Sequence, residues 1–154
     1  MREVAPISLG PTIFVKGVVA AGVFQDAAET DESDWEPFAG RPDIDAPEGL
    51  RFGLRVEGES MNQIYPPGTI LECVKYYGNE PLANGRRVIV ERFKVGDGVE
   101  ATVKEYMKDG EGIEWLMPRS NNPRFQSPFR CDQPEDGIDR IEVTAIVVAA
   151  TIKE

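Results

Sequence analysis

The chain contains no histidine and only two cysteines, Cys73 and Cys131. Without histidine a Ser-His-Asp triad is impossible, and the usual zinc ligand sets of histidine and cysteine cannot be assembled. The two cysteines lie far apart in sequence, so we expect two reduced thiols, with a disulfide between them as the alternative. We therefore expect no metal site and no cofactor, and any catalysis must use other residue types.

Long apolar runs and net basic charge are also missing. The longest apolar stretch, near residues 146–150, is too short to span a bilayer, and the N-terminus lacks the pattern of a signal peptide. We therefore expect a cytoplasmic protein with no membrane partner. The formal net charge is −10. A surface this acidic repels phosphate backbones, so we do not expect these residues alone to bind DNA or RNA.

Short β-rich segments separated by turns containing Gly or Asn make up most of the chain. These segments are rich in Val, Ile and aromatic residues and span 12–24, 50–58, 69–77, 86–94, 99–107, 112–118 and 138–152. Strands at this spacing predict a mainly β fold, a compact antiparallel domain. Only residues 60–65 could begin a helical turn, and Pro66 and Pro67 would end it.

The composition changes twice along the chain and divides it into three parts. Residues 1–24 form an apolar N-terminal tail, and residues 49–154 form the β domain. Residues 25–48 between them are acidic and carry three prolines, which predicts an exposed loop or linker. Trp35 and Phe38 could attach this loop to the surface, but a plain solvated acidic face is the simpler interpretation.

Ser60 lies in the segment VEGESMNQIYPPG, residues 56–68, between a Gly-Glu pair and a methionine. A serine hydroxyl is a poor nucleophile until a base takes its proton. Without histidine, the candidate bases are carboxylates, lysines and tyrosines. Taken alone, however, a serine at this position also fits a turn or a cap.

A lysine can act as a base only when it is neutral. Its pKa of about 10.4 must then fall by several units, which requires burial among apolar neighbours. Lys104, inside a β-rich segment, fits this requirement best, and Lys75 is the nearest competitor. Lys94 and Lys108 flank turns. Taken alone, Lys104 also fits an ordinary solvent-facing strand position.

Several motifs that follow one another in a fixed order are more specific evidence of function than Ser60 or Lys104 alone. V-x-G-E-S-M is followed by P-P-G-T-I-L, then by A-T-V-K-E, then by L-M-P-R-S-N-N-P-R-F. This order resembles the LexA-type family of self-cleaving repressors, the S24 peptidases, which are related to bacterial signal peptidases. Upstream, VVAAGVF at residues 18–24 is similar to the Ala-Gly cleavage site of the family. The resemblance covers residues 15–150 and implies the LexA/signal-peptidase β fold with an N-terminal cleavage-site segment.

The resemblance also implies roles for individual residues. Ser60 would be the nucleophile, Lys104 the general base, and the backbone N–H groups of Glu59 and Ser60 the oxyanion hole. The scissile bond would be Ala21-Gly22, where small residues let the segment bend into a narrow cleft of the same molecule. Without the serine-lysine pair, we would interpret VVAAG as an ordinary buried strand that ends at a glycine.

The implied function is Ser-Lys autoproteolysis that inactivates a transcriptional repressor in an SOS-type response to DNA damage. In the family, a recombinase filament on single-stranded DNA stimulates the cut, which separates a DNA-binding domain from a dimerising one. We therefore expect a homodimer that contacts DNA only through an N-terminal domain absent from these residues. The chain would then be a C-terminal fragment of a longer repressor. The run at residues 141–152 fits a dimer strand and a core strand equally well.

Other functions remain open. The fold could keep Ser60 and Lys104 without the reaction and act as a non-cleaving dimerisation module. It could also be the accessory subunit of a translesion DNA polymerase. A peptidase that acts on other proteins, like a signal peptidase, is a weaker third possibility.

Overall fold

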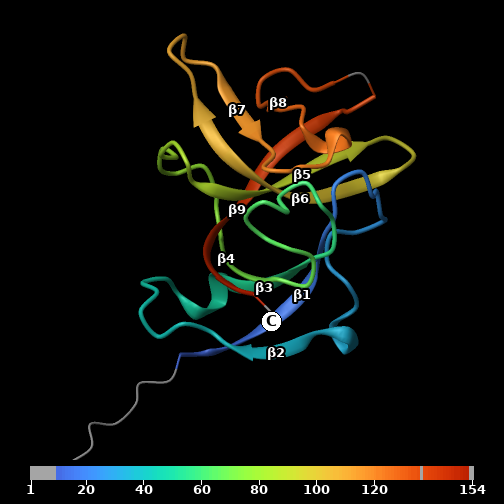
Figure 1. Cartoon of the computed structure of the whole chain (residues 1–154). Coiled ribbons are helices and arrows are strands. Elements are labelled where there is room, and N and C mark those ends of the chain that lie inside the picture. The colour runs from blue at the N-terminus through green and yellow to red at the C-terminus, as the bar shows by residue number, and fades with distance from the viewer. Residues whose placement is uncertain (1–9, 136, 153–154) are drawn as a thin grey trace, which may run out of the picture.

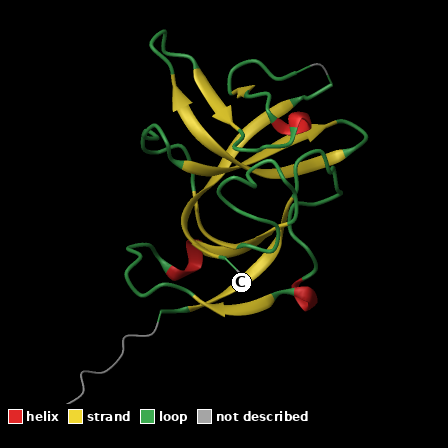
Figure 2. Ribbon diagram, in the orientation of Figure 1, coloured by secondary structure: helices red, strands yellow, loops and turns green. Residues whose placement is uncertain are grey.

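A computed structural model describes residues 10–135 and 137–152, so the first nine residues of the predicted tail lie outside it. Within this part, the chain forms nine β-strands and three single-turn 3-10 helices, with no α-helix (Figures 1 and 2). The strands are β1 (Thr12–Val19), β2 (Glu36–Ala39), β3 (Arg51–Val56), β4 (Ile70–Lys75), β5 (Arg87–Lys94), β6 (Gly98–Lys108), β7 (Glu114–Met117), β8 (Phe129–Arg130) and β9 (Arg140–Thr151). The 3-10 helices are η1 (Glu32–Asp34), η2 (Glu48–Leu50) and η3 (Pro123–Phe125). The predicted mainly β fold is confirmed. No helix in the described ranges has the length and apolar character needed to cross a membrane.

All nine strands belong to one sheet, in the order β2-β1-β3-β4-β9-β5-β6-β7-β8. Neighbouring strands are antiparallel, as predicted, except for β1 and β3, which run parallel. The parallel pair arises because the chain returns along one edge of β1 as β2 and then joins the other edge as β3. The sheet is therefore mixed at this single place.

Two apolar clusters cover opposite faces of the sheet around β5. Ile89 belongs to the larger cluster, whereas its neighbours Val88 and Val90 belong to the smaller one. Because alternate residues of a strand point to opposite faces, β5 is buried on both sides. A strand buried on both sides needs a continuous apolar run, and the sequence Val-Ile-Val of β5 provides one.

The predicted tail and linker both contribute strands to this sheet. β1 lies between β2 and β3, with Ile13, Val15 and Val19 buried. The ammonium of Lys16 lies 4.7 Å from the ring centroid of Trp35, which attaches the acidic loop to β1. The three-part division of the chain stays a prediction, but two of its parts pack into the sheet of the third.

The C-terminal run considered as a dimer strand or a core strand forms β9. It pairs with β4 along one edge and with β5 along the other (Figure 1). β5 covers residues 140–146 along one edge of β9, and β4 covers residues 145–151 along the other. Within the described residues, 147–151 therefore have no strand paired on the β5 edge, and β9 fits a core strand in one half and leaves room for a partner strand in the other.

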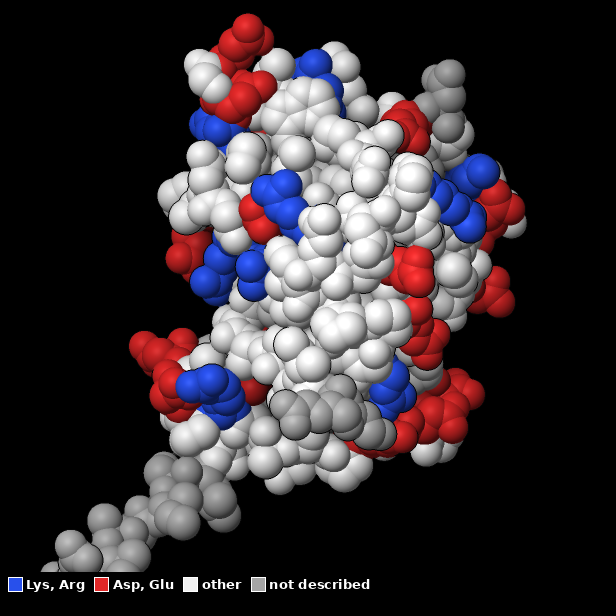
Figure 3. Space-filling model, viewed as in Figure 1, with Lys and Arg blue, Asp and Glu red and all other residues white. Residues whose placement is uncertain are grey.

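The face shown in Figure 3 carries charged side chains around its margins and a largely uncharged band between them. Its basic groups are separated from one another by acidic or uncharged ones. This face of the described residues therefore has no continuous basic strip of the kind that follows a phosphate backbone.

A buried ion pair joins β3 to β4. The guanidinium of Arg51 bonds the carboxylate of Glu72, and each side chain is 4% exposed. The backbone of Arg41 closes the arrangement, because its N–H donates to Glu72 at 2.9 Å and its carbonyl accepts from Arg51 at 2.7 Å. This pair therefore holds the part of the acidic loop around Arg41 on the sheet.

We expect Glu72→Ala to lower the free energy of unfolding by about 3–5 kcal/mol, because the guanidinium of Arg51 is left buried without its partner. Glu36→Ala is the matched control, since it removes an exposed ion pair with Arg55. That change should cost less than about 1 kcal/mol. Urea unfolding followed by tryptophan fluorescence measures both variants, and equal losses would contradict the expectation.

Candidate active site

Ser60 lies in a tight turn between β3 and β4, which we call the nucleophile turn (residues 59–65). Hydrogen bonds from the N–H groups of Ile64 and Tyr65 to the carbonyl of Met61 close it. The side chain of Met61 is 1% exposed and packs in the larger apolar cluster. Burial of Met61 holds one residue of the turn against the core, next to Ser60, which is 5% exposed.

Lys104 lies in β6, and only 1% of it is exposed. Burial lowers its pKa to about 8, against the opposing charge of Glu100 and with a smaller contribution from Arg92. The competing Lys75, in contrast, is exposed at the end of β4. The structure therefore places Lys104, and not Lys75, in the environment that a lysine base requires.

Thr102 connects the serine and the lysine. The amine of Lys104 donates to Thr102 Oγ1 at 3.0 Å, and the same oxygen lies 3.4 Å from Ser60 Oγ. Sequence reasoning missed Thr102, although it stands two residues before Lys104 in a predicted strand. That spacing places both side chains on one face of the strand.

The predicted cleavage segment occupies the open edge of β6. β7 pairs only with residues 105–108 of β6, which leaves the first half of that edge without a neighbouring strand. The N–H of Ala20 donates to the carbonyl of Ala101 at 2.9 Å, and Gln25 forms a β-bridge with Val99. Residues near the predicted cut therefore take the place of a neighbouring strand.

Ala21 and Gly22 form the centre of a tight turn within this segment. The N–H of Val23 donates to the carbonyl of Ala20 at 3.3 Å, and Gly22 has a φ of +82°. A positive φ at this turn position strongly favours glycine. A Cβ on Gly58 would lie 3.2 Å from the nitrogen of Ala21. Because Gly58 has no side chain, the Ala21-Gly22 turn can lie close to the backbone that leads into the nucleophile turn.

A cavity of about 340 Å³ joins the predicted cleavage site to the predicted base. Ala21, Gly22 and Lys104 all belong to its wall, and so do Arg124 and Phe125 of η3. The structure thus brings the two halves of the predicted site, which are far apart in sequence, to one place.

A buried ion pair lies beside the lysine. Two nitrogens of Arg92 donate to the carboxylate of Glu100 at 2.6 and 2.8 Å, and the N–H of Gly22 donates to the same group at 2.6 Å. Both Arg92 and Lys104 lie over the ring of Phe129, at 4.0 and 5.4 Å from its centroid. Glu100 therefore holds Gly22 and also acts electrostatically on Lys104.

The backbone N–H groups of Glu59 and Ser60 lie in the nucleophile turn, outside any strand. Within the described ranges, neither group donates a hydrogen bond to the protein. Two free donors next to a nucleophile are what an oxyanion hole requires.

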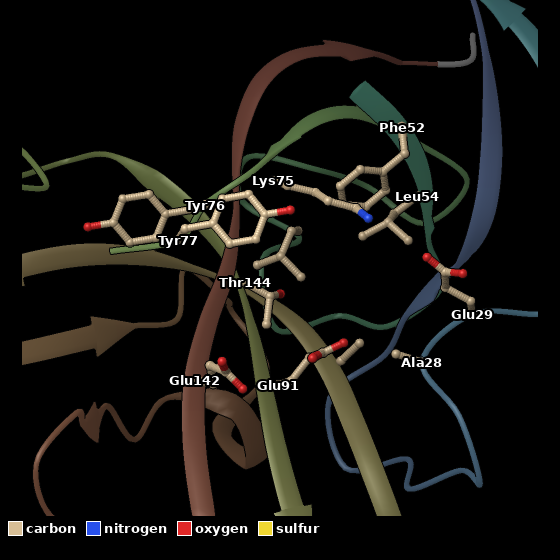
Figure 4. Close-up of a pocket in the computed structure, with 12 residues that line it drawn as sticks. Ala28, Glu29, Phe52, Leu54, Lys75, Tyr76, Tyr77, Glu91, Glu142 and Thr144 are labelled. Atoms are coloured by element: carbon tan, nitrogen blue, oxygen red, sulfur yellow. The ribbon is translucent and has the colours of Figure 1, made fainter. Parts of the chain in front are cut away.

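A second cavity, of about 260 Å³, lies on the opposite face of β6 (Figure 4). Its wall includes Ala101 of β6, the rings of Tyr76 and Tyr77, and the carboxylates of Glu91 and Glu142. Its wall contains neither Ser60 nor Lys104, so it is separate from the predicted site. The described residues also contain no group of three or more Asp, Glu, Cys or His side chains arranged to hold a metal ion.

The sequence matches the Peptidase S24-like family over residues 13–148. The chain belongs to this family. The match includes Ser60, Lys104 and the Ala21-Gly22 turn, and the family is of the serine peptidase type. No match was found among curated proteins.

We expect Lys104 of this S24-like chain to titrate near pH 8, as followed by NMR of its ε-carbon. Glu100→Gln should lower the midpoint, because a nearby negative charge favours the ammonium form. Arg92→Gln should raise it, because a nearby positive charge disfavours that form. Shifts of the same sign in the two variants would contradict this account.

Lys104→Met should stabilise the protein at neutral pH. The unfolded lysine has a pKa of about 10.4, and the folded one about 8, so below pH 8 burial of the ammonium costs on the order of 3 kcal/mol. Between these two values the unfolded chain binds more protons, so wild-type stability rises with pH. Urea unfolding should therefore show a gap between variant and wild type that narrows on going to alkaline pH. A difference in unfolding free energy between variant and wild type that does not change with pH would rule out burial of the Lys104 ammonium as its cause.

Proposed function

We propose that this chain is the self-cleaving C-terminal domain of a LexA/phage-repressor-like transcriptional repressor. A dyad of Ser60 and Lys104 cuts the Ala21-Gly22 bond, and the cut inactivates repression in an SOS-type response to DNA damage. One observation carries the proposal: the buried Lys104, linked to Ser60 through Thr102, shares a cavity with the Ala21-Gly22 turn.

The first step of the proposed reaction forms an ester. Neutral Lys104 takes the proton of the Ser60 hydroxyl, and Ser60 Oγ attacks the carbonyl carbon of Ala21. The N–H groups of Glu59 and Ser60 stabilise the negative charge on the carbonyl oxygen. The bond to Gly22 then breaks, and the Lys104 ammonium gives its proton to the departing nitrogen.

The second step is hydrolysis. Water attacks the ester between Ser60 and Ala21 and passes a proton to Lys104. The ester bond breaks as Lys104 returns this proton to Ser60 Oγ, which restores the hydroxyl. The carboxyl group of Ala21 is released and loses its own proton to solvent. The same lysine therefore acts as base and acid in turn, which suits a group with a pKa of about 8.

The docked position of the cleavage segment supports an intramolecular reaction. The segment is held on β6 by Ala20 and Gln25 on either side of the Ala21-Gly22 bond. A substrate held in place by its own chain reacts at a high effective concentration, so it needs few specific contacts.

The repressor function implies partners and a location. We propose a homodimer in the cytoplasm, with a recombinase filament on single-stranded DNA as the activator. Contact with DNA would pass through an N-terminal domain that is not among these residues. Dimerisation would matter because two linked half-sites multiply the affinity for an operator.

Intact mass after incubation at mildly alkaline pH tests the proposed reaction. The wild type should lose a fragment that ends at Ala21, while Ser60→Ala and Lys104→Ala keep their full mass. Because only neutral lysine is active, the rate should rise about tenfold per pH unit below the pKa of about 8 and level off above it.

Each other outcome has a distinct meaning. Cutting that persists in Lys104→Ala would remove the lysine from the mechanism. A wild-type chain that stays whole even with the recombinase filament added would favour the alternatives, a non-cleaving dimerisation module or a translesion-polymerase accessory subunit.

A further inference from the structure

Glu105 directly follows Lys104 on β6, and its carboxylate lies between two arginines. Arg119 donates to Glu105 at 2.7 Å, and Arg87 approaches its other oxygen to 4.0 Å. The side chain of Glu105 is only 13% exposed, so solvent screens these contacts less than it screens a surface pair.

The two arginines also hold the two ends of the nucleophile turn. The backbone N–H of Arg119 donates to the carbonyl of Ser60 at 2.9 Å, and its carbonyl accepts from Gln63 at 3.0 Å. At the other end, Arg87 lies over the ring of Tyr65, 5.4 Å from its centroid, and donates to the hydroxyl at 3.3 Å. One carboxylate on β6 is therefore connected to both ends of the turn.

We propose that Arg119 and Glu105 are positioning residues that hold the nucleophile turn in register with β6. This inference rests on the proposed function, because the distance it controls is the one between Ser60 and Lys104. Glu105 alternates with Lys104 along the strand and points to the other face. Its carboxylate therefore does not touch the reacting atoms and acts only through the turn.

The nucleophile turn needs such an anchor because no strand pairing holds it. Ser60 and Lys104 meet through Thr102, and the contact between the two hydroxyl groups is long, at 3.4 Å. Misplacement of a reacting group by about 1 Å can cost about a hundredfold in rate. The backbone of Arg119 holds Ser60, and the side chain of Arg119 is bonded to Glu105. This side-chain contact therefore determines how firmly the backbone of Arg119 stays in place.

The test measures the reactivity of Ser60 in the intact 154-residue chain, and it works whether or not the chain cleaves itself. A small fluorophosphonate forms a bond from Ser60 Oγ to phosphorus, releases fluoride, and transfers the serine proton to Lys104. Labelling does not require the Ala21-Gly22 bond to be cut. It does require access to Ser60, which is 5% exposed beside the docked segment, so rates are compared only among variants that leave that segment unchanged. The variants are Arg119→Ala, Arg119→Lys and Glu105→Gln. Arg41→Ala is the matched control, since it removes an ion pair with Asp43 away from this turn.

Arg119→Ala and Glu105→Gln should each lower the rates of phosphonate labelling and self-cleavage by about tenfold or more. The pH at half-maximal rate should stay as in the wild type, because the assigned role is to position Ser60 and not to tune Lys104. Arg119→Lys should recover part of the rate, since it keeps the charge. Arg41→Ala should react as the wild type does.

Wild-type rates in Arg119→Ala would overturn the inference. So would a shift of the pH midpoint without a lower maximal rate. A wild type that neither cuts itself nor reacts with the phosphonate, even with the recombinase filament added, would instead defeat the proposed function. Hydrogen exchange then decides the positioning role by itself: the N–H of Gln63 should exchange faster in Arg119→Ala, and unchanged exchange would refute it.

Discussion

The structure depends on an ammonium group that is kept out of water. Lys104 is almost fully buried, and the resulting desolvation lowers its pKa to about 8. The charge of Glu100 limits this fall, and Arg92 in turn neutralises Glu100 and adds its own opposing charge. Burial alone would favour a lysine that is always neutral, whereas the three charges together favour one that changes protonation near neutral pH. A group of that kind can both accept and return a proton.

β6 links this lysine to the other parts of the site. One of its faces carries Thr102 and Lys104, and the other packs against the core with Val103. Its open edge receives the segment around Ala21-Gly22 because β7 covers only the far half. The arginine pair on Glu105, the next residue, extends the connection to the nucleophile turn. Small changes in the register of this one strand would therefore disturb Lys104, the Ala21-Gly22 turn and Ser60 together.

Local patterns in the sequence predicted the long strands well, and they singled out Lys104 as the buried lysine. The segment 99–107 became β6, and the motif order indicated the family that the comparison confirmed. β8 has only two residues, too few for a periodic pattern, and the parallel pairing of β1 with β3 depends on the path of the whole chain. The contact of Arg119 with Ser60 likewise joins distant segments. Thr102 differs from these, because strand alternation alone would have been sufficient to place it on the same face as Lys104.

Because of the position of β1, cleavage of the Ala21-Gly22 bond and dissociation of the N-terminal fragment would be two separate events. This strand ends at Val19, just before the Ala21-Gly22 bond, and is paired with β2 on one edge and β3 on the other. Hydrolysis of one peptide bond removes none of this pairing and none of the burial of Ile13 and Val15. The severed piece would stay in the sheet as a non-covalent strand until local unfolding frees it. Hydrolysis of the bond and dissociation of the fragment would then have separate energy barriers. A cleaved molecule would keep the fold of the uncleaved one for as long as β1 stays paired in the sheet.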